Sequence, residues 1–219
     1  MAFYDELVQA TAAERNALLS IPIIGAALAG RVSLAQYLAF LIQAYHHVKH
    51  TLPLLMACGG RIPESHEWLR TSLTHYIEEE TGHQEWILND IRACGGDAEA
   101  VRHGKPNMHT ELMVAYAYDV IARQNPVGFL GMVHVLEGAS VQLAIHAATA
   151  IQKSLNLPKA AFSYLNSHGS LDIEHVGYFK ELVNMLSDEQ DRQAVLHCAR
   201  MFYYLYGNIF RSLPQGEAL

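Results

Sequence analysis

Apolar residues recur about every 3.6 residues along almost the whole chain of 219 residues, and this period constrains the fold more than any other feature. No segment alternates strictly between apolar and polar residues, as a half-buried strand would. The predicted fold class is therefore all-α. Turn signals divide the chain into about seven helices, without repeats, linkers or low-complexity tracts. We expect a single helical domain over residues 1–219.

The same turn signals set the expected helix boundaries. We expect helices over about residues 4–19, 33–58, 63–94, 110–123, 126–154, 158–186 and 187–213. Ser33 should cap the second helix, and Ser187 with Gln190 should cap the last. Pro53 should bend the second helix and the glycines at 59–60 should end it, while residues 21–25 should form a turn.

Composition and charge exclude several classes of protein. The net charge is −7 without a basic cluster, so nucleic acid is not an expected partner. No apolar run reaches the ~18 to 20 residues of a membrane span, and residues 18–28 lack the basic start of a signal peptide. The three cysteines are too few and too scattered for a disulfide framework. We expect a cytoplasmic protein with reduced thiols and no membrane partner.

Histidine usage points to metal chemistry. The chain has 13 histidines, well above ordinary usage, and they cluster. Histidine is the commonest nitrogen ligand of first-row metals. His168, Asp172 and His175 follow one another at i, i+4 and i+7 in a predicted helix, so they share one face as a polar stripe. Alone, this stripe could also be a salt-bridged helix surface.

Two other predicted helices carry carboxylates of the same kind. Glu80 and His83 are three residues apart, about 60° around a helix axis and one turn along it. Glu137 lies in the apolar run 132–139, where a buried carboxylate is costly unless a metal, a proton or a cation compensates it. A solvated Glu–His pair and a carboxylate bonded to Tyr or His are the ordinary interpretations. Together with the stripe, however, these residues predict a two-metal site inside a helix bundle.

The types of ligand indicate which metal to expect. Carboxylate and imidazole donors suit Fe or Mn, whereas a structural zinc site would take thiolates or a compact set of four ligands. We expect two Fe ions, with Mn as the alternative, and open coordination positions that bind O2. Haem is not expected, because Gly128, Gly131 and Gly138 do not give the close-approach spacing that would face an axial histidine.

A further group of residues could line the substrate pocket or support the metal ligands. Gln43, His46 and His47 crowd the second predicted helix, although a polar helix face would explain them as well. His134 lies one turn before the central carboxylate, where core packing is the other interpretation. Tyr76 could donate a hydrogen bond near the stripe.

The order of these residues resembles that of the haem-oxygenase-like diiron oxidases, a branch of the fold shared with TenA-type thiaminases and the PQQ-synthesis oxidase. In that branch a Glu and a His near the third helix precede a lone Glu and then a His-x3-Asp-x2-His run. In this chain the pattern falls on Glu80, His83, Glu137, His168, Asp172 and His175. Because the family varies the interval from Glu to His, Glu79 is an alternative first ligand. The resemblance spans about residues 36–210.

The resemblance implies a haem-oxygenase-like bundle and a non-haem diiron oxidase that uses O2 to oxidise a small organic acid, amine or amino acid. Relatives of this fold without metal exist, so the alternative is a metal-free TenA/PqqC-like protein that binds a small molecule or acts without a cofactor. We also expect a homodimer, because helices with exposed aromatic residues could pair.

Overall fold

The computed structural model describes the backbone of residues 1–214, and the side chains of that range except those of residues 139–142 and 168–175. This part of the chain forms twelve α-helices and three short 3-10 helices, with no strand among the described residues. The predicted all-α class is therefore confirmed. Within the same residues no single helix combines the length and apolar character of a membrane span, although the bent pair 126–138 and 143–155 does so when taken together.

The helices have the following bounds. The first half of the chain contains α1 (Phe3–Ala10), α2 (Ala12–Leu19), α3 (Pro22–Leu28), α4 (Leu34–Val48), α5 (Thr51–Arg61), η1 (Glu64–His66), α6 (Glu67–Glu79), α7 (His83–Ala93) and α8 (Ala98–His103). The second half contains α9 (Met108–Arg123), η2 (Pro126–Phe129), α10 (Leu130–Leu155), η3 (Lys159–Ala161), α11 (Ser163–Asn184) and α12 (Glu189–Arg211).

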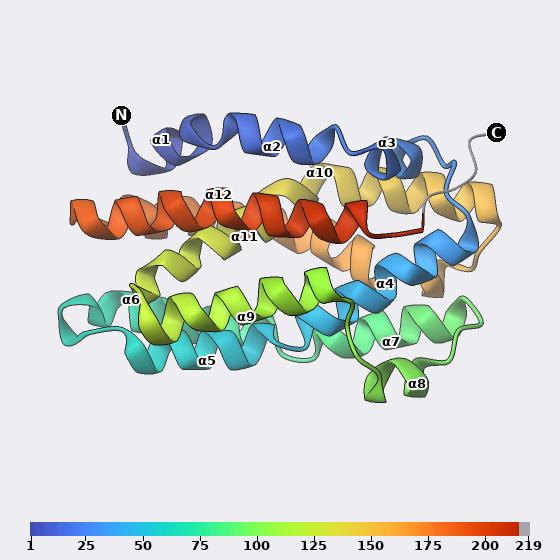
Figure 1. Cartoon of the computed structure of the whole chain (residues 1–219), viewed down its shortest axis with the longest axis horizontal. Coiled ribbons are helices and arrows are strands. Elements are labelled where there is room, and N and C mark those ends of the chain that lie inside the picture. The colour runs from blue at the N-terminus through green and yellow to red at the C-terminus, as the bar shows by residue number, and fades with distance from the viewer. Residues whose placement is uncertain (215–219) are drawn as a thin grey trace.

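The long helices pack into a closed ring. Helix α10 has its most extensive contacts with α11 and α12, and the ring continues from α12 through α9, α4 and α7 back to α11. Figure 1 shows α12, in red, running along the molecule between α1–α3 on one side and α5 and α9 on the other. Segments far apart in the sequence therefore meet in the interior of the ring, where bundles of this kind place their sites.

Helices α10 and α12 come unusually close together at Gly131. A Cβ at this position would lie 2.5 Å from the backbone nitrogen of Ala199 and 2.7 Å from the carbonyl oxygen of Val195. Neither backbone atom could move aside without displacing α12, so only glycine permits this approach. The contact fixes the position of α10 two turns before Glu137.

One predicted helix is broken in the structure, and the break is close to the candidate ligands. The helix expected over residues 63–94 is divided into α6 and α7, with Gly82 between them at φ +94°, in the left-handed region that favours glycine. Glu80 follows the last residue of α6, and His83 is the first residue of α7. The predicted geometry of these two residues, on one face of a continuous helix, is therefore wrong.

The structure also corrects the predictions that rested on proline and glycine. Residues 21–25 do not form a turn, because Pro22 starts α3, where its missing N–H costs nothing. The second predicted helix breaks at residues 49–50, and Pro53 lies in the first turn of α5. Helix α5 then continues through the glycines at 59–60 to Arg61. Glycine is unfavourable inside a helix, but it does not end this one.

Helix caps were predicted with mixed success. The predicted N-cap at Ser33 is confirmed. The structure shows it as a capping box, since its hydroxyl accepts a hydrogen bond from the backbone N–H of Gln36 and the Gln36 side chain accepts one from the Ser33 N–H. At the last helix the cap is Asp188, whose carboxylate accepts a bond from the Gln190 N–H, and not Ser187. The first predicted helix is interrupted at Thr11, between α1 and α2.

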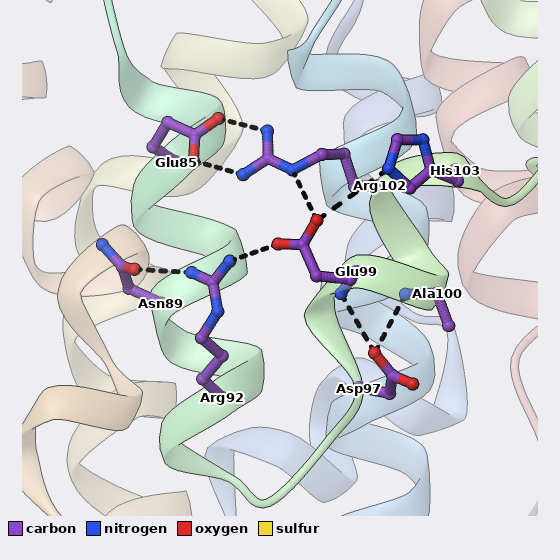
Figure 2. Close-up of polar contacts among 8 residues, drawn as sticks. All are labelled: Glu85, Asn89, Arg92, Asp97, Glu99, Ala100, Arg102 and His103. Atoms are coloured by element: carbon purple, nitrogen blue, oxygen red, sulfur yellow. Dashed lines mark hydrogen bonds and ion pairs between the residues drawn. The ribbon is translucent and has the colours of Figure 1, made fainter.

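Helix α8 was not predicted from the sequence, and a surface network of ion pairs holds it against α7 (Figure 2). Arg102 donates to both carboxylate oxygens of Glu85, at 2.7 and 2.8 Å, and Arg92 donates to Glu99 at 2.7 Å. The Arg102 guanidinium lowers the pKa of Glu85. Asp97 caps the first turn of α8. Because the partners are largely exposed, the network orients α8 more than it stabilises the fold.

Candidate functional site

A cavity of about 100 Å3 lies where α4, α5, α10, α11 and α12 meet the junction between α6 and α7. Two predicted metal ligands that are distant in sequence, Glu80 and Glu137, line this cavity. The other polar side chains of its lining are His47, Thr51, Tyr76, Tyr164 and Tyr206. The remaining lining is apolar, so the carboxylates face a small and mostly apolar space.

Glu80 and His83 contact each other across the break between α6 and α7. Glu80 Oε2 lies 2.9 Å from His83 Nδ1, and both residues are buried. The His83 ring also stacks on Trp86, with the ring centroids 4.0 Å apart. The turn at Gly82 thus brings Glu80 and His83 together, although they were expected to meet on one face of a continuous helix. A carboxylate this close to an imidazole nitrogen helps to orient the ring.

The structure distinguishes Glu80 from its neighbour Glu79. Glu79 Oε1 lies 3.2 Å from Nε2 of the half-exposed His75, one turn earlier in α6. Glu79 is not among the residues that line the cavity, whereas Glu80 is. Of the two alternatives for the first ligand, the geometry therefore favours Glu80.

Tyr76 lies against the same group of carboxylates. Its side chain is buried in the cavity wall, and its ring centroid is 5.5 Å from that of Tyr178. Burial raises the pKa of Tyr76, and the nearby carboxylate of Glu137 raises it further. The Tyr76 hydroxyl therefore keeps its proton at neutral pH and can act as a hydrogen-bond donor at the site.

The side chains of His168, Asp172 and His175 lie outside the described residues. The helix that contains them, α11, has a well-defined start, which is fixed by the fully buried Asp90 of α7. Asp90 accepts hydrogen bonds from the backbone N–H groups of Ser163 and Tyr164, at 2.9 Å each. Burial raises the pKa of Asp90, against the effect of these hydrogen bonds. Asp90 thus acts as a helix cap supplied by another helix.

Two of the predicted pocket histidines lie in different surroundings. His47 lines the cavity, and its ring meets that of Tyr206 edge to face with the centroids 5.9 Å apart. His46 is also buried but is not part of the lining; it packs edge to face on Tyr45. Burial lowers the pKa of His46 to about 4, and Lys49 lowers it in the same direction. Both rings are buried, yet only His47 faces the site.

Gln43 and His134 lie away from the cavity. The Gln43 side chain accepts hydrogen bonds from the Asn107 N–H at 3.0 Å and from the Thr110 hydroxyl at 2.8 Å, which ties α4 to the start of α9. His134 Nε2 lies 3.4 Å from the Thr11 hydroxyl oxygen. That hydroxyl donates its own proton to a backbone carbonyl, so Nε2 is the donor of the pair. Burial lowers the pKa of His134 to about 4.

Sequence reasoning missed three residues that shape the site. Tyr164 and Tyr206 line the cavity, and Asp90 holds the helix to which Tyr164 belongs. Asp90 carried a weak signal, because a carboxylate between Leu88 and Ile91 on an apolar helix face requires hydrogen bonds when it is buried. Nothing local distinguishes Tyr164 or Tyr206 from the other aromatic residues of the chain.

The donor types fit non-haem iron, although the described part of the chain contains only some of the predicted donors. Within it, no group of three His, Cys, Asp or Glu side chains is arranged to hold a metal ion. It does contain the contact between Glu80 and His83, with Glu137 in the wall of the same cavity. Buried carboxylates with an imidazole are donors that iron and manganese accept. The other predicted donors belong to residues 168–175.

Comparison with protein families places the chain. Residues 38–207, more than half of the chain, match the family described as iron-containing redox enzymes. The chain belongs to this family. Comparison with curated proteins gives no match. Membership of the iron-containing redox enzymes agrees with the expectation of iron, without specifying the number of ions or the reaction.

Solved structures confirm the haem-oxygenase-like fold. A domain of unknown function with a heme oxygenase-like fold from Shewanella denitrificans OS217 is 26% identical, with a TM-score of 0.85 over 96% of this chain and 91% of that one. A TenA homolog from Pseudomonas syringae pv. tomato DC3000 is 10% identical, with a TM-score of 0.81 over the same shares of the two chains. Heme oxygenase-1 from the cyanobacterium Synechocystis sp. PCC6803, in complex with heme, is 12% identical, with a TM-score of 0.76 over 97% of this chain and 92% of that one.

Proposed function

We propose that this protein is a non-haem diiron oxidase or oxygenase, which uses O2 to oxidise a small organic acid, amine or amino acid. The observation that carries the proposal is the convergence of Glu80 and Glu137 on one small cavity, with His83 in contact with Glu80. Membership of the iron-containing redox enzymes supports iron as the metal. Burying two carboxylates beside an apolar space is costly unless a positive charge compensates them.

In this proposal the metal ligands would be Glu80, His83, Glu137, His168, Asp172 and His175. Bound iron would supply the electrons for the reduction of O2. The three carboxylates would offset most of the charge of two Fe(II) ions, and Glu80, which contacts His83, would help to hold its ring in place. Tyr76 would keep a proton close to the carboxylates, and the apolar lining would limit the access of water to the site.

A metal-free protein is the second candidate. In it, the cavity would hold a small molecule directly, as the likeness to a TenA homolog allows. This candidate predicts that iron neither binds at stoichiometric levels nor stabilises the fold. The expected homodimer remains a prediction in either case.

Iron loading separates the two candidates. Anaerobic addition of Fe(II) to the purified protein should give about two irons per chain, and O2 should then produce a transient visible absorption band. The measurements are iron analysis after desalting and stopped-flow absorbance. His168→Ala should lower the iron content more than His134→Ala, because His134 contacts Thr11, away from the cavity.

Two results would contradict the diiron assignment. The first is iron that stays at trace level under conditions where a ferritin-like control protein loads fully. The second is an equal loss of iron in the two histidine variants, because a residue outside the cavity would then matter as much as a predicted ligand.

A further inference from the structure

A second cavity, of about 130 Å3, lies beside the first and is bounded by α2, α3, α4, α10, α11 and α12. Its lining is mostly aliphatic and aromatic, and its polar side chains are those of Gln36, Tyr37 and Tyr206. The described lining contains no acid, lysine, arginine or histidine. Leu19, which belongs to the lining, is exposed, so this side of the cavity reaches the protein surface.

The two cavities adjoin each other. Phe40, Ala144, Leu165 and Tyr206 line both of them. Four shared residues, from α4, α10, α11 and α12, therefore separate the apolar cavity from the one that Glu80 and Glu137 line. A single elongated molecule that passed between these side chains would occupy both spaces.

The polar side chains of the apolar cavity are already engaged elsewhere. The Tyr37 hydroxyl donates to the backbone carbonyl of Ala161 at 2.8 Å. Gln36 completes the capping box of α4 with its side-chain oxygen and donates from its nitrogen to the carbonyl of Pro214 at 2.9 Å. Apart from Tyr206, which both cavities share, the described lining therefore offers shape and apolar contact rather than hydrogen bonds. Such a space favours hydrocarbon.

We propose that the substrate is an amphiphile whose alkyl chain lies in the apolar cavity and whose polar group faces Glu80 and Glu137. This inference rests on the proposed function, because it names the class of substrate for the same site. The lining of the two cavities determines the orientation of the substrate. Glu80, Glu137 and His47 line only the first cavity, and residues of α2 and α3 line only the apolar one. An empty apolar cavity costs stability in proportion to its volume, whereas a bound chain recovers that cost.

Small side chains should determine the length of chain that fits. Ala27 on α3 and Ala147 on α10 line the apolar cavity but not the carboxylate cavity. A larger side chain at either position would fill the part of the apolar cavity that the distal methylenes would occupy. It would not reach the cavity that Glu80 and Glu137 line. In this proposal the two alanines determine the longest alkyl chain that the protein accepts.

The test measures the binding of straight-chain alcohols from butanol to decanol to the metal-free protein by calorimetry. Affinity should rise about fourfold with each added methylene until the cavity is full. In Ala147→Phe, and separately in Ala27→Phe, the rise should stop at a shorter alcohol. Ala17→Phe makes the same change on the exposed face of α2 and should bind like the wild type. In the metal-free wild type, decylamine should bind more tightly than decanoate, because its head group would lie beside two carboxylates.

Affinity that does not depend on chain length, or an unchanged length limit in both phenylalanine variants, would overturn the alkyl-chain proposal. Equal binding of decylamine and decanoate would overturn the proposed orientation. Iron loading of the same variants tests the diiron assignment independently of alkyl-chain binding. Ala27→Phe and Ala147→Phe should load iron like the wild type, so a protein that binds alcohols but no iron would refute only the proposed function.

Discussion

Two adjacent glutamates show how a single helix terminus can decide what a carboxylate binds. Glu79 is the last residue of α6, and its side chain turns back along the helix to His75. Glu80, one residue later, lies beyond the helix, contacts His83 and lines the cavity. The sequence could not separate them, because the separation depends on the left-handed backbone at Gly82. That glycine was part of the predicted helix, where nothing local marked it as a break.

The different surroundings of the two glutamates predict different effects on metal binding. Glu80→Gln should lower the affinity for Fe(II) by at least about tenfold, because it removes a ligand charge and weakens the contact with His83. Glu79→Gln is the matched control and should leave the affinity unchanged, since Glu79 contacts His75 and does not line the cavity. Titration of both variants with Fe(II) under anaerobic conditions measures the effect. Loss of affinity in Glu79→Gln alone would reverse the assignment of the first ligand.

At the scale of the helices, the sequence predicted the element type well and the boundaries unevenly. The N-cap at Ser33 was predictable, because the hydrogen bonds that it makes are local. The break between α4 and α5 was not, since the ring of His50 at that corner bonds the Tyr118 hydroxyl of α9, a contact 68 residues away. The role of each glycine was the hardest feature to predict. It depends on whether a neighbouring helix packs against the glycine, in the volume that a side chain would otherwise occupy.

Two glycines in long helices should therefore respond in opposite directions to the same substitution. Gly131→Ala would place a Cβ against the backbone of α12, and we expect it to lower the free energy of unfolding by about 1–3 kcal/mol. Gly177→Ala has open space around its Cβ and should raise that free energy by roughly 0.5–1 kcal/mol, because alanine favours helix. Urea denaturation measures both. A neutral Gly131→Ala would show that α10 and α12 do not pack closely in solution.

At the scale of the whole molecule, the candidate site joins segments that the sequence separates widely. The cavity brings the junction of α6 and α7 together with α10, and its wall includes Tyr164 and Leu165 of α11. The sequence could predict which residue types might serve as ligands, because carboxylates and histidines stand out in apolar helices. It could not predict the apolar cavity next to them, because ordinary core residues form its walls. That space depends on how α3, α4, α10 and α12 pack.

A metal that bridges these segments should stabilise the entire fold, because the unfolded chain cannot hold the ligands together. With free Fe(II) about a hundredfold above its Kd, binding should contribute about 2.7 kcal/mol and raise the Tm by roughly 5–10 °C under anaerobic conditions. Asp172→Asn keeps the shape of the side chain but removes one ligand charge, so most of this rise should disappear. Asp5→Asn, at an exposed position of α1, is the control and should retain it.

The metal-free candidate predicts the opposite response at Asp172. Without iron, this carboxylate would lie beside two imidazoles as a charge taken out of water, and the amide would cost little or would even stabilise the fold. Adding Fe(II) would then change neither the Tm of the wild type nor the Tm of Asp172→Asn. Differential scanning fluorimetry of both proteins, each with and without the metal, distinguishes the two cases. If Fe(II) does not change the Tm of the wild type, the predicted ligands do not form a metal site, and the diiron proposal fails with them.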